Sequence, residues 1–269
     1  MTAPRPLSVL TIAGSDSGGG AGIQADLKTF AAHGVHGLSA IAALTAQHTR
    51  AVTAVHVPPV AFLRAQIDAC FEDFDIGAVK LGMLATAEVI DAVADALQAH
   101  RPAHVVLDPV MVATSGAKLL ADDALEAMRG RLLPLAGIVT PNIPEAELLL
   151  GTPIADGDAA DRAAAALRAL GARAVLLKGG HLEEGDQVID RYRDDAERSV
   201  FAHARMRIDG HGTGCTLASA IAANLCRGLP IAQACARATD YVHAALRAGY
   251  RPGHSDVLVL GHLHAGVAA

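Results

Sequence analysis

The feature that most constrains the fold is an alternation of short apolar runs with longer helical patterns, which is typical of βαβ units and a mainly parallel sheet. The apolar runs predict buried strands at residues 7–13, 38–45, 78–82, 105–108, 138–140 and 174–178. The helical patterns predict helices at residues 21–33, 59–71, 87–100, 121–132, 159–170, 215–225 and 231–248. Residues 187–193 and 199–204 form a polar pattern that predicts an antiparallel hairpin at one edge. We therefore expect an α/β fold with helices flanking a central sheet.

Length and composition favour one domain that acts on small molecules. With 269 residues, 52% of them hydrophobic, the chain can build one large domain or two smaller ones. No Pro/Ser/Gly-rich linker divides it, so we predict a single domain over residues 1–269. The net charge is −6, aromatic residues make up 3%, and no Lys/Arg cluster occurs, which argues against nucleic-acid binding.

The sequence also argues against export and membrane insertion. No apolar run reaches the roughly 20 residues of a membrane span, and Met1–Pro6 lacks the pattern of a secretory signal. The four cysteines contain no CxxC pair, which disfavours a zinc site. A disulfide framework is not expected in a chain of this length, so we expect a reducing cytoplasm.

Chemically useful residues follow the predicted strands. They are Gly14, Gln47, Asp108, Asn142 and Lys178. In open α/β sheets, ligands bind beyond the carboxyl ends of the strands. We therefore expect these residues to share one site.

The sequence HGTGCT at residues 211–216 predicts an anion site. Gly212 and Gly214 bracket Thr213 immediately before a small, apolar run at residues 217–225. A helix that starts there would present unpaired N–H groups and the positive end of its dipole. Cys215 places a titratable group beside them, which suggests transfer of a charged group.

A glycine-rich segment follows the first strand. Residues 14–22 contain five glycines, which would let the backbone approach a ligand closely. The segment lacks both the G-x-G-x-x-G spacing and a Walker A lysine, which argues against a dinucleotide oxidoreductase and a P-loop enzyme. Asp26, one turn into the next helix, fits either a ligand contact or an acid favoured by the helix dipole.

Two side chains at other strand ends could read a flat, polar ring. The amide of Gln47 offers a donor and an acceptor side by side, which suits an aminopyrimidine or amide edge. Met83 could cover such a ring, although core packing is the commoner fate of methionine.

The remaining candidates suit a nucleotide and its metal ion. Asp108 could hold Mg²⁺ through water or cap a helix. Asn142 and Glu145, three residues apart, fit a site or a helix cap equally. Lys178, followed by two glycines, suits a point charge on a nucleotide phosphate.

Seven motifs between Ala13 and Ala222 resemble those of the hydroxymethylpyrimidine/phosphomethylpyrimidine kinases of thiamine biosynthesis, within the ribokinase-like superfamily. They are AGSDSGGGAGIQADLKTF, LTAQHT, KLGML, VLDPVM, TPNIPEAELL, LKGGH and HGTGCTLASAIA. The resemblance implies a ribokinase-like fold and a homodimer. It also implies ATP- and Mg²⁺-dependent phosphorylation of 4-amino-5-hydroxymethyl-2-methylpyrimidine and then of its monophosphate.

The same resemblance implies roles for individual residues. The pyrimidine pocket would consist of Gly14, Ala21, Asp26, Thr45, Gln47, Met83 and Val110. The N–H groups of Gly212, Thr213 and Gly214 would bind the γ-phosphate, and the nucleotide-binding side chains would be Thr213, Lys178, Asn142 and Glu145. Asp108 and Glu145 would organise Mg²⁺ and its waters.

Cys215 stands where ribokinases usually carry a catalytic aspartate. A thiol at a helix N-terminus should have a depressed pKa, so we expect a thiolate that accepts the proton of the substrate hydroxyl. A pyridoxal kinase and a non-catalytic pyrimidine sensor are the alternatives, and the presence of Cys215, Lys178 and Glu145 argues against a sensor.

Two segments depart from the family pattern. Thr114–Ser115–Gly116 replaces a Lys-Ser-Gly sequence, so a phosphate contact of that lysine is missing. Near the end, residues 253–264 lack the usual Gly-Pro and Asn-His pattern of the family, and His262 and His264 form an HxH pattern that we expect to be solvated.

Overall fold

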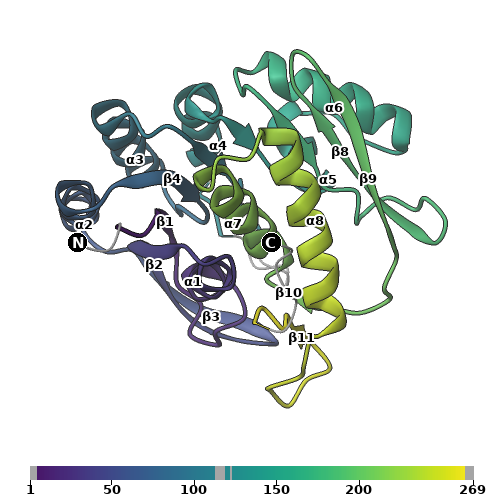
Figure 1. Cartoon of the computed structure of the whole chain (residues 1–269), viewed down its shortest axis with the longest axis horizontal. Coiled ribbons are helices and arrows are strands. Elements are labelled where there is room, and N and C mark those ends of the chain that lie inside the picture. The colour runs from purple at the N-terminus through teal and green to yellow at the C-terminus, as the bar shows by residue number, and fades with distance from the viewer. Residues whose placement is uncertain (1–4, 113–118, 122, 264–269) are drawn as a thin grey trace.

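The computed structural model describes residues 5–112, 119–121 and 123–263. Its centre is a nine-stranded sheet in the order β3-β2-β1-β4-β5-β6-β7-β8-β9 (Figure 1). The strands from β2 to β7 in this order pair in parallel. They are β1 (Ser8–Gly14), β2 (His36–His48), β4 (Ile76–Leu81), β5 (Val105–Leu107), β6 (Ile138–Val139) and β7 (Val175–Leu177). The predicted fold class is therefore confirmed.

Both edges of the sheet are antiparallel. The predicted hairpin is β8 (Gln187–Arg193) and β9 (Arg198–Ala204), with β8 paired to β7. At the other edge, β3 (Ala51–His56) pairs with the outer half of β2, and this strand was not predicted. The side chains of β3 are mostly exposed, so the sequence there lacks the apolar pattern of a buried strand.

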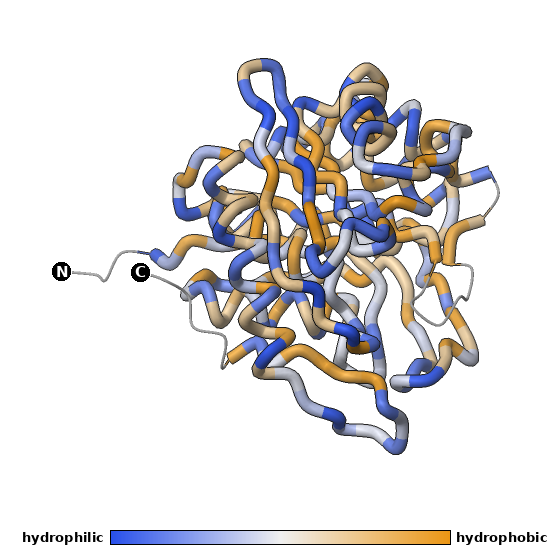
Figure 2. Tube along the Cα trace, turned by 90° about the vertical axis from the view of Figure 1, so that its right-hand side faces the viewer, coloured by the Kyte–Doolittle hydropathy of each residue, from blue (hydrophilic) through white to orange (hydrophobic). Residues whose placement is uncertain are grey.

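Helices cover both faces of the sheet, because successive strand residues point to opposite sides. Val9 belongs to one core, whereas Leu10 and Ile12 belong to the other. The first face carries α1 (Gly22–Ala32), α7 (Thr213–Cys226) and α8 (Ile231–Arg247), which lie toward the viewer in Figure 1. The second carries α2 (Val60–Asp73), α3 (Ala87–His100), α4 (Ala124–Ala127), α5 (Ile143–Leu150) and α6 (Gly157–Ala169). Apolar segments gather in the interior, and polar segments occupy the protruding turns (Figure 2).

One predicted helix, at residues 121–132, is irregular. After α4 the chain forms a π-helical turn (Met128–Leu132) and a 3-10 turn (Leu133–Leu135). Pro134 lacks a backbone N–H group and so prevents continuation as a regular helix. Within the described ranges, no helix is both long and apolar enough to cross a membrane.

The segment near the end of the chain packs back onto the start of α7. β11 (Leu258–Val259) pairs with β10 (Gly210–His211), directly before that helix. His262 is buried, and its Nε2 lies 3.0 Å from the Thr216 hydroxyl. The expectation of a solvated His262 was therefore wrong, because sequence alone did not reveal this packing. His264 and Thr114–Gly116 lie outside the described residues.

Candidate active site

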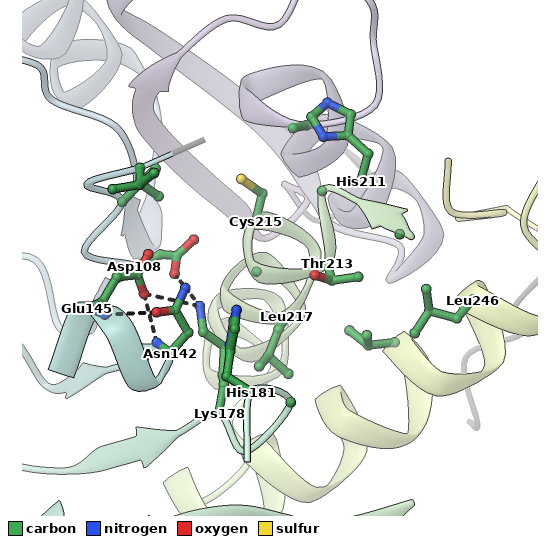
Figure 3. Close-up of a pocket in the computed structure, with 18 of the residues that line it drawn as sticks. Asp108, Asn142, Glu145, Lys178, His181, His211, Thr213, Cys215, Leu217 and Leu246 are labelled. Atoms are coloured by element: carbon green, nitrogen blue, oxygen red, sulfur yellow. Dashed lines mark hydrogen bonds and ion pairs between the residues drawn. The ribbon is translucent and has the colours of Figure 1, made fainter. Parts of the chain in front are cut away.

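A pocket of about 660 Å³ lies at the carboxyl ends of the parallel strands, beside the start of α7. It is lined by every predicted site residue except Asp26: Gly14, Ala21, Thr45, Gln47, Met83, Asp108, Val110, Asn142, Glu145, Lys178, Gly212, Thr213, Gly214 and Cys215. Residues from seven separate segments of the sequence thus converge, as the rule for open α/β sheets predicts. Figure 3 shows the charged cluster below Cys215, with His211 on the other side of the sulfur.

One end of the pocket is a charged cluster. The Nζ of Lys178 lies 3.0 Å from Asp108 Oδ1 and 3.7 Å from Glu145 Oε2 (Figure 3). Asn142 and Glu145 form a capping box at the start of α5: the Asn142 N–H donates to Glu145 Oε2, and the Glu145 N–H donates to Asn142 Oδ1. The helix-cap interpretation of these two residues is therefore confirmed, and both also face the pocket.

Burial and mutual charge set the protonation of this cluster. Burial raises the pKa of Glu145 to about 7, with Asp108 adding to the effect and Lys178 opposing it. Burial also works against the charged form of Lys178, but Asp108 and Glu145 hold its pKa above the ordinary value. The lysine is thus a fixed positive charge at neutral pH, whereas Glu145 is poised to lose or gain a proton.

The start of α7 lies beside this cluster and is shaped for an anion. Gly212 caps the helix with a φ of 85°, and a Cβ there would come within 2.0 Å of the Gly20 carbonyl oxygen. Only glycine fits this position. A Cβ at Gly214 would lie 3.0 Å from Lys178 Nζ, so the lysine and the helix start approach each other closely. Unpaired N–H groups and an ammonium group therefore face the same space.

Cys215 does not have the depressed pKa that its position suggested. Part of its side chain faces the pocket, but burial raises the pKa of the thiol to about 11. The charge of Lys80 and the Gly22 N–H work against that rise, whereas Asp26 and Asp108 add to it. The expectation of a thiolate near neutrality was wrong, because desolvation outweighs the favourable helix terminus.

Asp26 lies beneath the pocket rather than in its wall. Its carboxylate is fully buried and lies 2.9 Å from Lys80 Nζ, which is also fully buried. Thr11 and Ser219 donate their hydroxyl protons to the same carboxylate, at 2.6 and 2.7 Å. Burial disfavours the lysine charge, but Asp26 holds the pKa of Lys80 above its ordinary value. This position favours a structural role for Asp26 instead of the expected ligand contact.

The other end of the pocket is lined by Gly14, Thr45, Gln47, Met83 and Val110. Gly14 and Met83 are in close contact, and a Cβ on Gly14 would lie 3.1 Å from the Met83 sulfur. Val110 and the partly exposed Gln47 complete this end. The Thr45 hydroxyl lies 2.8 Å from the Ser15 carbonyl and 3.1 Å from Gln47 Oε1.

Two pocket residues, Asp16 and His211, were not assigned a role from the sequence. The Asp16 carboxylate accepts hydrogen bonds from the N–H groups of Gly18, Gly20 and Ala21. Burial alone would raise the pKa of Asp16, but the bonds from His211, Ala21 and Gly18 bring it below the ordinary value. Both residues stand inside the glycine-rich motifs, and this position was the one feature of the sequence that pointed to a role in the site.

The donor set fits a hydrated magnesium ion. Asp108 and Glu145 supply carboxylate oxygens next to the anion-binding helix start. In the part of the chain that the structure describes, no group of three or more His, Cys, Asp or Glu residues could hold a metal by itself. Mg²⁺ usually keeps several waters and takes ligands from substrate phosphates, so the two carboxylates are donors of the kind that it uses.

A family model and curated relatives match almost the whole chain. The model of a family described as phosphomethylpyrimidine kinase matches residues 16–259. The chain is 52% identical to a hydroxymethylpyrimidine/phosphomethylpyrimidine kinase of Rhizobium meliloti, over 90% of this chain and 91% of that protein. It is 53% identical to the thiamine biosynthesis bifunctional protein ThiED of Geobacter sulfurreducens, covering 91% of this chain and only 50% of that longer protein.

Solved structures of two kinds of kinase resemble this fold. A phosphomethylpyrimidine kinase from Clostridium difficile is 42% identical, with a TM-score of 0.80 over 89% of this chain and 99% of that one. A pyridoxal kinase from Staphylococcus aureus, in complex with AMP-PCP and pyridoxal, is 32% identical. Its TM-score is 0.88 over 97% of this chain and 95% of that one. The architecture is therefore common to both activities, and sequence identity favours the pyrimidine kinases.

Proposed function

The chain belongs to the phosphomethylpyrimidine kinase family, and on that premise we propose that it phosphorylates 4-amino-5-hydroxymethyl-2-methylpyrimidine and then its monophosphate, with ATP as the donor. The observation that carries this proposal is one pocket that brings Gln47 and Met83 together with the charged cluster of Asp108, Glu145 and Lys178. Cys215 lines the same pocket at the start of α7.

At the end lined by Gly14 and Met83, Gln47 would recognise the substrate. Its amide can donate to a ring nitrogen and accept from the neighbouring exocyclic amine. Met83 and Val110 would cover the ring, while Gly14, Ala21 and Thr45 would shape the remaining wall. A pyridoxal-type ring lacks this amine next to a ring nitrogen, so the same amide favours the aminopyrimidine.

At the charged end, the protein would align and stabilise the phosphoryl group. Phosphoryl transfer depends mainly on positioning and on stabilising charge over the transferred oxygens. The N–H groups of Gly212, Thr213 and Gly214 would bind those oxygens, and Lys178 would neutralise their charge. Asn142 keeps the start of α5, and with it Glu145, facing the nucleotide.

Asp108 and Glu145 would hold the water ligands of Mg²⁺. When bound, the ion would supply positive charge to the phosphate oxygens. Glu145 must then be ionised, which its pKa of about 7 allows at neutral or higher pH.

Cys215 would contact the acceptor hydroxyl. A thiol with a pKa of about 11 is protonated at neutral pH, so it cannot accept the proton before transfer begins. In a loose transition state, little deprotonation of the acceptor is needed early. We therefore assign Cys215 the orientation of the hydroxyl, and the proton leaves to a phosphate oxygen or water.

The direct test is an assay of the purified protein with ATP, Mg²⁺ and the aminopyrimidine alcohol, scored for mono- and diphosphate products. The Gln47→Ala variant should raise KM for the pyrimidine about tenfold and leave KM for ATP within about twofold. Gln98→Ala, an exposed position on α3, is the matched control. Efficient turnover of pyridoxal without turnover of the pyrimidine would refute the proposal, and so would a loss confined to ATP.

We also propose a homodimer in a reducing cytoplasm. Large apolar side chains are exposed on β2, β3 and the start of α2, at Leu44, Val55 and Phe62. A second copy could cover Phe62, which is 62% exposed, since exposed apolar surface commonly marks interfaces. Sedimentation equilibrium should give twice the chain mass, and Phe62→Lys should lower the measured mass.

All four cysteines are free thiols, which suits a reducing compartment.

A further inference from the structure

His211 connects the two ends of the pocket. It is the last residue of β10, directly before the anion-binding turn at Gly212. Its ring is buried, and its Nε2 lies 2.9 Å from Asp16 Oδ2 and 3.2 Å from the Gln47 Nε2 position. These partners come from positions 195 and 164 residues away in the sequence.

The hydrogen bonds around Asp16 fix which nitrogen of His211 carries a proton. Asp16 accepts from the backbone N–H groups of Gly18, Gly20 and Ala21, as an ionised carboxylate does. A deprotonated Nε2 would direct its lone pair at this carboxylate from 2.9 Å, which is repulsive. The Nε2 of His211 is therefore a donor.

The same reasoning fixes the amide of Gln47. The Nε2 of His211 carries one proton, and its contacts with Asp16 at 2.9 Å and with the Gln47 amide at 3.2 Å make it the shared donor of a three-centre bond only if the amide oxygen faces it. The single hydroxyl proton of Thr45 goes to the Ser15 carbonyl at 2.8 Å, so the Thr45 oxygen is an acceptor, and a half-turn of the Gln47 amide places its nitrogen at the position 3.1 Å away. Both neighbours thus select the same amide orientation.

We propose that His211 is a positioning residue for substrate recognition, because its Nε2–H holds the Gln47 amide in one orientation toward the pocket. The amide then keeps one N–H and one carbonyl lone pair free, in a fixed order. That order matches a ring nitrogen beside an exocyclic amine in one ring orientation. This inference rests on the proposed role of Gln47 as the group that reads the pyrimidine.

Tight packing makes His211 part of a rigid unit. A Cβ on Gly20 would lie 2.6 Å from the Cδ2 of His211, and a Cβ on Gly212 would lie 2.0 Å from the Gly20 carbonyl oxygen. The glycine-rich loop, the histidine ring and the anion-binding turn therefore cannot shift independently. Gln47 is therefore held by the same group of segments that would place the turn at Gly212 against the phosphate.

A double-mutant cycle tests the proposal. His211→Met and Gln47→Ala should each raise KM for the aminopyrimidine about tenfold, with KM for ATP changed less than about twofold. If His211 acts through Gln47, the double variant should be no worse than Gln47→Ala alone. His211→Gln, which retains an N–H donor, should recover most of the affinity. His33→Leu is the matched control, since His33 is also buried but bonds to Thr29 and does not line the pocket.

The possible failures are distinct. If Gln47→Ala leaves KM for the pyrimidine unchanged, the proposed role of Gln47 fails. If Gln47→Ala has its effect but His211→Met multiplies it, His211 acts independently and the inference is overturned. Should His211→Met not fold, the ¹⁵N shifts of the His211 ring in the unmodified protein decide. A protonated Nε2 supports the inference, and an unprotonated Nε2 overturns it.

Discussion

The pKa of Cys215 yields the sharpest prediction, which concerns its reactivity with iodoacetamide as a function of pH. An ordinary cysteine has a pKa of about 8.5, whereas burial raises that of Cys215 to about 11. At pH 8 the thiolate fraction should therefore be lower by roughly 10²-fold. A more basic thiolate is intrinsically more nucleophilic, which recovers about tenfold of that loss. The net expectation is alkylation on the order of tenfold slower than that of glutathione.

Peptide mass spectrometry after timed alkylation between pH 7 and 11 measures this rate for each cysteine. The rate for Cys215 should still be rising at pH 10, and ATP with the pyrimidine should protect it, since the thiol lines the pocket. Cys70 on α2, outside the pocket, is the internal control and should show no protection. A midpoint below pH 9 for Cys215 would refute the burial argument and restore the thiolate base. In that case kcat would also change tenfold per pH unit below the midpoint, instead of remaining nearly flat above pH 8, where Glu145 is ionised.

Two further predictions concern the buried charges. Lys80→Met should lower the free energy of unfolding by about 3–5 kcal/mol, because Asp26 stays buried without its partner. The Lys80→Met/Asp26→Leu double variant should regain most of that loss in urea unfolding, and a single-variant loss below about 1 kcal/mol would contradict the reasoning. The raised pKa of Glu145 means that its contribution to stability is complete below about pH 4 and is lost as the pH rises through about 7. Glu145→Gln should therefore stabilise the ligand-free protein at pH 8 by up to about 3 kcal/mol and raise the Mg²⁺ needed for half-maximal activity. A stability difference that persists at pH 4 would speak against the titration of Glu145 as its cause.

The central fold was predictable from the sequence because buried parallel strands are continuous apolar runs. β5 and β7 illustrate this, since each consists of three buried apolar residues and is followed by a polar residue. β3 carries mostly exposed side chains, and β10 and β11 have two residues each. None of them therefore has a hydrophobic pattern from which a strand could be predicted. Pairing with distant segments, rather than local pattern, creates those strands.

The site was predictable where its members lie at strand ends, and not where remote residues decide their environment. Asp26 stands in a ligand-like motif, but its partners Lys80 and Ser219 are 54 and 193 positions away. The position of Cys215 at a helix start predicted a low pKa from local geometry. The desolvation that raises this pKa instead comes from the packing of the whole fold. His211 shows the same limit, because its two partners come from the opposite end of the chain.

The pairing of β11 with β10 has a consequence for biosynthesis on the ribosome. The Leu258 N–H donates to the Asp209 carbonyl, and Val259 is in register with His211, so the turn before α7 is held by residues that are translated after it. A nascent chain that ends before residue 257 contains every group proposed to contact the substrates, but it lacks the pairing of β11 with β10. Such a ribosome-bound intermediate should bind nucleotide weakly, and affinity should emerge only when residues 258–259 have left the exit tunnel.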